Sequence, residues 1–263
     1  MKIGVFDSGV GGLTVLRALL RRVPADYVYL GDTARLPYGA KSRATVARYA
    51  VSSAKFLVEE QGAEFLVIAC NTASALALDA IRESVVVPVL GVVETGANAA
   101  NANSRSRDVL VIATAATVES HAYAAACAER KLRAIEKACP LLVPLVEEGW
   151  IEHPVTAEVL RIYMAELMEQ ARDAGLEADT LVLGCTHYPL LRQPIEKVVP
   201  EALKVIDSAE VTADQVAKRL ERAGGSRTTA EFFATDSVKK FRALGSRFLG
   251  REIDRVELVD LGG

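Results

Sequence analysis

Short apolar runs of strand length recur along the whole chain, and amphipathic helical segments separate them. The clearest helical segments are Leu13–Arg22, Ser42–Gln61 and Val155–Ala174. Continuous runs of Val, Ile and Leu are typical of parallel strands that helices cover on both faces. The pattern therefore predicts an α/β fold with parallel sheets. Its predicted strands are Ile3–Phe6, Tyr27–Leu30, Phe65–Ala69, Val87–Leu90, Val109–Ala113, Leu142–Pro144, Thr180–Leu183, Lys204–Ile206 and Glu231–Thr235.

Two of the strand-to-helix units are alike in outline. In one, Phe65–Ala69 leads into Cys70, and in the other, Thr180–Leu183 leads through a glycine into Cys185. We interpret this likeness as duplication of a half-unit, although βα turns in general are somewhat alike. The small, polar stretch within 94–107 is loop-like and predicts a boundary. A chain of 263 residues has room for two domains, and without a low-complexity linker we expect them to pack closely around a cleft.

Composition and charge exclude several classes of function. The formal net charge of −3 leaves no strongly basic surface of the kind that nucleic-acid binding requires. The apolar runs are broken by Asn, Pro or Gly and fall far short of the ~20 residues of a membrane span. The chain starts directly at the first predicted strand, so we expect no secretory signal and no N-terminal extension. These features predict a cytoplasmic protein that partners neither nucleic acid nor membrane.

The ends of the predicted strands supply the candidate site residues, because ligands of open α/β sheets bind beyond the carboxyl ends of the strands. This set contains thiols, carboxylates, an imidazole and many small hydrogen-bond donors, with no Lys or Arg and no metal-ligand spacing. In chain order its members are Asp7, Ser8, Gly9, Gly11, Gly12, Asp32, Thr33, Pro37, Tyr38, Gly39, Cys70, Asn71, Thr72, Thr114, Thr117, Ser120, Glu147, Glu148, Cys185, Thr186 and His187.

The glycine-rich turn after the first strand permits a nucleotide hypothesis. Gly9 and Gly11 follow a strand, and Asp32 stands near the ribose-binding offset of a dinucleotide fingerprint, but Thr14 occupies the third glycine position. A Walker loop fails as well, because no Lys precedes Thr14. A nicotinamide-dependent oxidoreductase built on Gly9, Gly11 and Asp32 stays open as an alternative to a plain tight turn. The free N–H groups of the following helix would in either case suit a carboxylate ligand.

The four cysteines fall into two groups, and the absence of a CxxC pair favours free thiols in both. Cys127 and Cys139 lie on helical or helix-end patterns away from strand ends, and we interpret them as small buried hydrophobes. Cys70 and Cys185 each stand at the carboxyl end of a strand. A helix N-terminus there would lower the thiol pKa from about 8.5 by favouring the thiolate.

A pair of thiols at separate strand ends suits few reactions. Inverting a carbon stereocentre without a cofactor requires one base to remove a proton and an acid on the opposite face to return one. Cysteine suits both roles because its pKa lies near neutrality, and Asp7 and His187 are candidate proton partners. The alternative is a hydrolase in which Cys185 is the nucleophile, His187 is its base and Cys70 belongs to the core.

Four segments of the chain resemble the signature segments of the glutamate racemases, in the aspartate/glutamate racemase superfamily. They occur in family order, and the resemblance covers essentially the whole chain. It implies cofactor-independent interconversion of L-glutamate and D-glutamate, supplying D-glutamate for peptidoglycan, by a homodimer. The choice of glutamate over aspartate rests on this resemblance alone. The four segments are Asp7-Ser8-Gly9-Val10-Gly11-Gly12, Leu36-Pro37-Tyr38-Gly39, Ala69-Cys70-Asn71-Thr72-Ala73-Ser74 and Gly184-Cys185-Thr186-His187-Tyr188-Pro189-Leu190.

The resemblance also implies roles for individual residues. Cys70 would take the Cα proton of the D-enantiomer with the help of Asp7, and Cys185 that of the L-enantiomer with the help of His187. Glu147 matches an acidic position near the site, although Glu148 beside it leaves that assignment open. The residues implied to hold the substrate are Asp7, Ser8, Pro37, Tyr38, Gly39, Asn71, Thr72, Thr114, Thr117, Thr186 and His187.

The domain organisation follows from the same resemblance. It implies two doubly wound parallel-sheet domains related by pseudo-symmetry, with the active site in the cleft between them. The second domain would be inserted as residues 93–205, and the first would be discontinuous, with residues 1–92 and 206–263.

Overall fold

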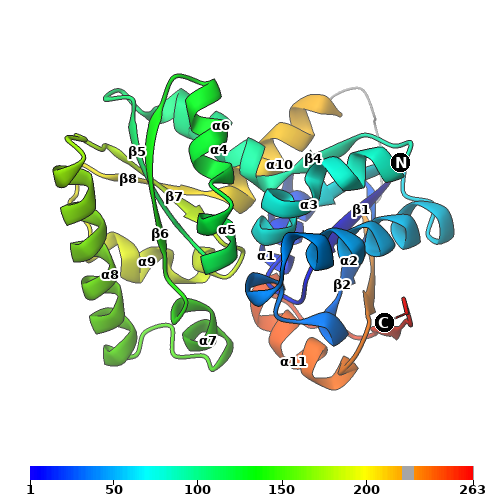
Figure 1. Ribbon diagram of the computed structural model, residues 1–263. Coiled ribbons are helices and arrows are strands. Elements are labelled where there is room, and N and C mark those ends of the chain that lie inside the picture. Colours follow the sequence, from blue (N-terminus) through cyan, green and yellow to red (C-terminus); the bar gives the residue numbers. More distant parts are fainter. Residues whose placement is uncertain (221–227, 263) are drawn as a thin grey trace.

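The structure is a computed structural model that describes residues 1–220 and 228–262. It contains two separate sheets, and all strand pairs in both sheets are parallel (Figure 1). The first sheet has the order β10-β9-β2-β1-β3-β4, and the second has the order β6-β5-β7-β8. The strands are β1 (Lys2–Asp7), β2 (Asp26–Gly31), β3 (Phe65–Ile68), β4 (Val89–Gly91), β5 (Asp108–Ala113), β6 (Arg133–Ala138), β7 (Thr180–Gly184), β8 (Lys204–Asp207), β9 (Thr229–Ala234) and β10 (Glu257–Leu258).

Helices cover both faces of each sheet, and we call each sheet with its helices a lobe (Figure 1). The chain passes from the first lobe to the second through α4 and returns through α10, which pack against each other. The helices are α1 (Leu13–Arg22), α2 (Arg43–Lys55), α3 (Asn71–Ser84), α4 (Val92–Asn103), α5 (Ala115–Glu119), α6 (Ala122–Glu129), α7 (Leu142–Glu147), α8 (Pro154–Asp173), α9 (Arg192–Glu196), α10 (Ser208–Arg219) and α11 (Val238–Leu249). Short helical turns are η1 (Thr33–Arg35), η2 (Tyr38–Ala40), η3 (Phe56–Glu60) and η4 (Tyr188–Leu191).

The two lobes repeat one strand order, which confirms the predicted α/β fold of two pseudo-symmetric parallel-sheet units. In the first lobe the central strands run β2-β1-β3-β4, and in the second they run β6-β5-β7-β8. This correspondence makes β3 the counterpart of β7. Cys70 follows β3 and Cys185 follows β7, so the two thiols stand at equivalent places in the two lobes.

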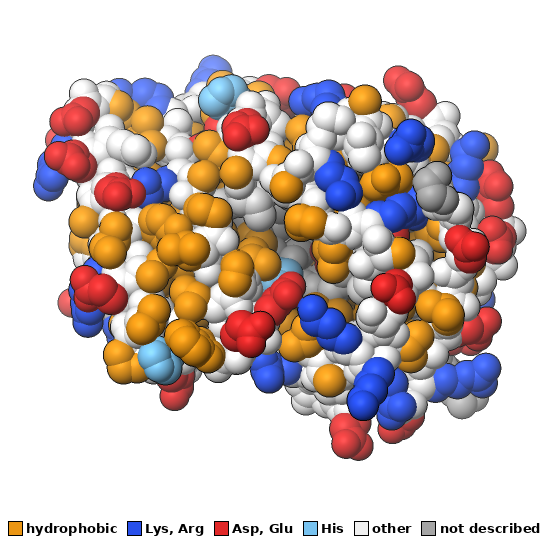
Figure 2. All heavy atoms as spheres, turned by 60° about the horizontal axis from the view of Figure 1, so that its bottom comes forward, with side chains coloured by type: hydrophobic (Ala, Val, Ile, Leu, Met, Phe, Trp, Pro, Cys, Tyr) orange, Lys and Arg blue, Asp and Glu red, His pale blue; other side chains and the backbone are white. Residues whose placement is uncertain are grey.

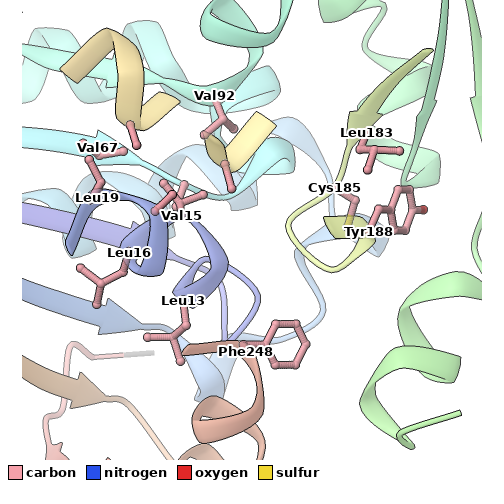
Figure 3. Close-up of a cluster of buried hydrophobic side chains, with 14 of the residues drawn as sticks. Leu13, Val15, Leu16, Leu19, Val67, Val92, Leu183, Cys185, Tyr188 and Phe248 are labelled. Carbon is pink, nitrogen blue, oxygen red and sulfur yellow. The ribbon is translucent and has the colours of Figure 1, made fainter. Parts of the chain in front are cut away.

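The core explains why the central strands are apolar throughout. In β1, Ile3 and Val5 belong to a buried cluster on the α1 side of the sheet, whereas Phe6 belongs to another on the α2 and α3 side. The α1-side cluster continues into the second lobe, where it includes Leu183 and Tyr188 (Figure 3). Because apolar burial is the main favourable term in folding, this shared core holds the two lobes together.

Leu142–Pro144 was expected to be a strand, and this prediction is wrong. These residues form the start of α7, where Pro144 is tolerated because the first N–H groups of a helix have no partner within it. The strand before this helix is β6, which lies at the edge of the second sheet. Residues of β6 are half-buried or exposed, so Arg133, Glu136 and Lys137 interrupt the continuous apolar run that marks a central strand.

The stretch within 94–107 was expected to be a loop, and most of it is helical instead. Helix α4 extends to Asn103, and only 104–107 form the turn before β5. Gly96, Ala97 and Ala100 on α4 are buried, and these small residues let the helix pack against β7 and α10. A helix with so few large apolar residues lacks the periodicity by which helices are recognised.

Two further expectations need comment. The predicted helix Ser42–Gln61 is interrupted, since α2 ends at Lys55 and a π-helical turn, η3, follows it. The predicted first domain includes residues 221–227 and 263, which lie outside the described residues. Among the residues that are described, no helix is both long and apolar enough to cross a membrane.

Candidate active site

Cys70 forms the turn between β3 and α3 and is the N-cap residue of that helix. Its Sγ accepts a hydrogen bond from the N–H of Ala73 at 3.4 Å and lies 3.5 Å from Oγ of Ser8. Burial, together with a smaller contribution from the charge of Asp7, raises the pKa of Cys70 to about 12. The expectation that the helix N-terminus lowers this pKa is therefore wrong, because desolvation outweighs the helix dipole here.

Asp7 ends β1 and points into the same region. Its Oδ2 accepts from the N–H of Gly9 at 2.9 Å, whereas Oδ1 is buried with no partner among residues 1–220 and 228–262. Burial raises the pKa of Asp7, and the hydrogen bond from Gly9 and the charge of His187 oppose that rise. A buried carboxylate oxygen without a partner is costly, so this atom is ready to receive a cationic or protonated group.

Cys185, His187 and Glu147 form a connected chain in the second lobe. The Sγ of Cys185 lies 4.0 Å from Nδ1 of His187, and Nε2 of His187 lies 3.1 Å from Oε1 of Glu147. Burial alone would lower the pKa of His187, but its interactions with Cys185 and Glu147 prevail and raise it to about 10. The hydrogen bond from His187 lowers the pKa of Glu147. Glu147 ends α7, so it reaches His187 from a helix and not from the predicted strand.

The first lobe directly contacts the linked side chains of the second lobe. Gly11 lies so close to it that an added Cβ would stand 2.2 Å from Oγ1 of Thr186 and 2.6 Å from Nδ1 of His187. Thr14, at the start of α1, donates to the carbonyl oxygen of Thr186 at 3.0 Å. Phe248 on α11 stacks its ring edge-to-face with His187, with centroids 4.9 Å apart, and Figure 3 shows its ring directed away from α11 toward the second lobe. The two thiol-bearing turns thus face one region where the lobes meet.

A cluster of three threonine hydroxyls also joins the lobes. Thr72, at the start of α3, lies 3.1 Å from Thr114 and 3.3 Å from Thr117 between their Oγ1 atoms. Thr114 and Thr117 are 2.9 Å apart and belong to the second lobe. Gly39 packs beside Thr114, since a Cβ on it would lie 3.5 Å away. Hydroxyl groups that converge from both lobes can donate to a carboxylate placed between them.

Asn71 also lines the site, and among the described residues only one of the two polar atoms of its side-chain amide has a hydrogen-bond partner. Its Oδ1 accepts from the hydroxyl of Tyr123 at 2.7 Å, while the buried Nδ2 finds no partner in the described part of the chain. Together with Oδ1 of Asp7, the site therefore holds one buried acceptor and one buried donor without partners. An ammonium and a carboxylate on one ligand would satisfy both atoms.

The geometry contradicts the nucleotide hypothesis. The carboxylate of Asp32 is fully buried and accepts hydrogen bonds from Arg35, Tyr38 and Thr235. It therefore has no oxygen free for a ribose hydroxyl, and Gly11 faces Thr186 and His187 where a pyrophosphate would have to lie. Pro37 and Tyr38, which were predicted to contact substrate, lie a few residues after Asp32 at the start of η2. Tyr38 is buried, and its hydroxyl donates a hydrogen bond to Asp32.

The remaining cysteines differ partly from expectation. All four are unpaired and buried, and Cys127 lies on α6 as predicted. Cys139 was expected away from strand ends, yet it directly follows β6, because that strand was not predicted. Within the described residues, no group of three or more His, Cys, Asp or Glu side chains is arranged to hold a metal ion.

Figure 2 shows the surface hollowed between the two lobes, with acidic side chains beside the hollow. Glu147 is partly exposed, with 30% of its side chain accessible, whereas Cys70 and Cys185 are each 5% exposed. The candidate site is therefore enclosed at its thiols and open toward its acidic edge. Enclosure strengthens electrostatic interactions with a bound ligand because it removes water.

Comparisons with known proteins identify the relatives of this chain. A protein of Koribacter versatilis named glutamate racemase is 54% identical, over 99% of this chain and 98% of that protein. A glutamate racemase of Bacillus anthracis has a TM-score of 0.91 at 36% identity, over 98% of this chain and 97% of the other. The glutamate racemase of Francisella tularensis, solved in complex with D-glutamate, has a TM-score of 0.88 at 34% identity, over 99% and 97%.

The two-lobed fold and these relatives show that the protein is an amino-acid racemase, an isomerase. The family described as Asp/Glu/Hydantoin racemase matches residues 3–216, and the chain belongs to this family.

Proposed function

We propose that the protein interconverts L-glutamate and D-glutamate by proton transfer at Cα, without a cofactor, with Cys70 and Cys185 as the two bases. The observation that carries the proposal is the pair of buried thiols at equivalent strand ends, each with its own acid–base partner. In one direction the Cys70 thiolate takes the proton of the D-enantiomer while the Cys185 thiol donates to the opposite face. The reverse direction exchanges these roles, so every turnover moves one proton to Cα and one from it.

The lining residues would hold the substrate while its proton is removed. Oδ1 of Asp7 would accept from the substrate ammonium, and that cation would also make a thiolate at Cys70 less unfavourable. The carboxylates would take donors from Nδ2 of Asn71, the threonine cluster, Ser8, Thr186 and the Pro37–Gly39 turn. Fixed donors aimed at the carboxylate stabilise the charge that develops when Cα loses its proton.

The decisive experiment follows the Cα hydrogen. Purified protein is incubated with either enantiomer of glutamate in deuterated water with no added cofactor, while NMR and optical rotation are recorded. We expect exchange of the Cα hydrogen and loss of rotation from both starting enantiomers. Absence of exchange with either enantiomer would refute the proposal.

Variants test the requirement for two bases. Cys70→Ala and Cys185→Ala should each abolish racemisation, because a single base cannot serve both faces of Cα. Cys127→Ala is the matched control, since Cys127 is also buried but lies on α6. Near-full turnover by either active-site variant would contradict the two-thiol mechanism.

We also propose that the enzyme is a cytoplasmic homodimer that supplies D-glutamate for peptidoglycan. Leu141, Trp150, Val155 and Ile162 are exposed large hydrophobic residues around α7 and α8, and Figure 2 shows hydrophobic side chains gathered on this lobe. Exposed apolar patches of this kind commonly mark contacts between proteins. Light scattering should give twice the 28.2 kDa of one chain, and a monomer at micromolar concentration would contradict the dimer.

A further inference from the structure

Tyr123 has no role in the mechanism described so far, yet it touches both thiol-bearing turns. It lies on α6 in the second lobe and is completely buried. Its hydroxyl donates to Oδ1 of Asn71 at 2.7 Å, and Asn71 directly follows Cys70 in the first lobe. This hydrogen bond therefore crosses between the lobes within one residue of a proposed base.

The ring of Tyr123 occupies a slot between two glycines. A Cβ on Gly96 of α4 would stand 3.0 Å from Cε1 of the ring, and a Cβ on Gly184 would stand 3.0 Å from Cε2. Gly184 ends β7 and directly precedes Cys185. The ring thus packs against the second thiol-bearing turn while its hydroxyl reaches the first, and side chains larger than glycine would displace it.

The hydroxyl also fixes which end of the Asn71 amide faces the site. Burial raises the pKa of Tyr123 far above its ordinary value, so the phenol stays protonated and acts as a donor. A donor at this position selects Oδ1 of Asn71 as its partner, which turns Nδ2 the other way. Nδ2 is the buried amide nitrogen that has no partner among residues 1–220 and 228–262.

We propose that Tyr123 is a positioning residue that sets the spacing of the two thiol-bearing turns and presents the Asn71 amide nitrogen to the substrate carboxylate. This inference rests on the proposed racemisation of glutamate and adds a residue to it. Tyr123 itself touches neither Cα nor a thiol in this scheme, and it acts through Asn71 and through the backbone at Gly184.

Tyr123→Phe is the first test, because it keeps the ring in its slot and removes only the hydroxyl. We expect KM for glutamate to rise about tenfold, the effect of one well-made hydrogen bond, with kcat changed less than about threefold. Tyr27→Phe is the matched control, since Tyr27 is also buried and donates to the carbonyl of Val23 at 2.6 Å. Both variants should lose similar thermal stability, but only Tyr123→Phe should raise KM.

A double-mutant cycle shows whether Tyr123 acts through Asn71. Adding Tyr123→Phe to Asn71→Ala should raise KM no further, because the hydroxyl then has no amide to orient. Additive effects on KM would overturn this route. A Tyr123→Phe enzyme with KM within about twofold of the wild type would overturn the positioning role itself.

Gly96→Ala tests the spacing role separately. The added methyl would press on the ring at 3.0 Å, whereas alanine by itself favours a helix over glycine. We expect kcat to fall at least about tenfold with no loss of helix content, since misplaced catalytic groups lower the rate steeply. An unchanged kcat would refute the spacing role.

Exchange of the Cα hydrogen by the wild type distinguishes failure of the proposed racemase function from failure of the proposed role of Tyr123. A wild type that exchanges no Cα hydrogen refutes the proposed function, and this role for Tyr123 falls with it. An active wild type with unaffected Tyr123→Phe and Gly96→Ala variants refutes the role of Tyr123 alone.

Discussion

The charge of Glu147 should set the upper pH limit of activity through His187. Glu147→Gln keeps a side chain of the same shape at 3.1 Å from Nε2 of His187 but removes the negative charge. His187 has its pKa raised to about 10 by Cys185 and Glu147, so the imidazolium persists through the neutral range and can stabilise a Cys185 thiolate. Without the carboxylate this pKa falls, and the imidazolium is lost at lower pH.

The magnitude follows from the exposure of the pair. A hydrogen bond to a charged group is worth about 1.5–3 kcal/mol. Since 30% of the Glu147 side chain and 12% of the His187 side chain are exposed, solvent screening favours the lower end of that range, about 1.5 kcal/mol. At about 1.36 kcal/mol for each pH unit, the alkaline limb of kcat/KM should move about one pH unit lower.

The assay measures kcat/KM for L-glutamate from about pH 6 to pH 11 with wild type, Glu147→Gln and Glu148→Gln. Titration of the substrate amine is common to all three, so a difference between their alkaline limbs belongs to the protein. Glu148 is the C-cap residue of the same helix, and its replacement removes the same charge. The reasoning is refuted if the limb of Glu147→Gln stays in place, or if Glu148→Gln moves it equally.

Three other variants probe the contacts between the lobes. Gly11→Ala should lower kcat/KM about 100-fold, because the new Cβ would meet Thr186 at 2.2 Å and His187 at 2.6 Å. Circular dichroism should show an intact fold, and a fully active variant would contradict the close approach. Thr114→Val should raise KM for glutamate about tenfold by removing one hydroxyl of the threonine cluster, and steady-state kinetics with an unchanged KM would exclude a substrate contact. His187→Asn should lower kcat from L to D about 100-fold, more than the reverse. Mirror-image substrates have an equilibrium constant of one, so kcat/KM must stay equal in the two directions. KM for L-glutamate should therefore fall relative to KM for D-glutamate by the ratio of the two kcat values, and equal losses of kcat in both directions would contradict pairing of His187 with Cys185.

The sequence predicted the strands whose residues form short, largely buried apolar runs. Strands β1, β3, β5 and β7 lie inside their sheets, so both faces are buried and the residues are continuously apolar. Strand β6 lies at an edge and carries Arg133, Glu136 and Lys137, so its pattern resembled a helix or loop. No local rule identifies an edge strand whose half-buried residues include charges, since their burial depends on what the rest of the chain places beside them.

Some residues of the candidate site could likewise be predicted from the sequence, and others could not. Residues at the carboxyl ends of strands, such as Asp7, Cys70 and Cys185, could be predicted because parallel strands bring these ends to one edge of a sheet. The pairing of Glu147 with His187 could not, because 40 residues and an unpredicted helix separate them. The pairing of Tyr123 with Asn71 spans 52 residues and two lobes, and a tyrosine on an alanine-rich helix carries no signal of it.

The two thiols stand at equivalent places in the two lobes, but the side chains beside them differ. Equivalent turns after β3 and β7 place one thiol in each lobe, which is what attack on two faces of one carbon requires. Cys70, however, has a carboxylate beside it, and both burial and Asp7 raise its pKa to about 12. Cys185 has an imidazole beside it, and His187 stays protonated to about pH 10. The two thiols therefore have unequal surroundings, since an acidic side chain lies beside Cys70 and an imidazolium lies beside Cys185. In the proposed complex the substrate ammonium lies toward Asp7, so its arrival would offset the negative charge of Asp7 and lower the cost of a thiolate at Cys70.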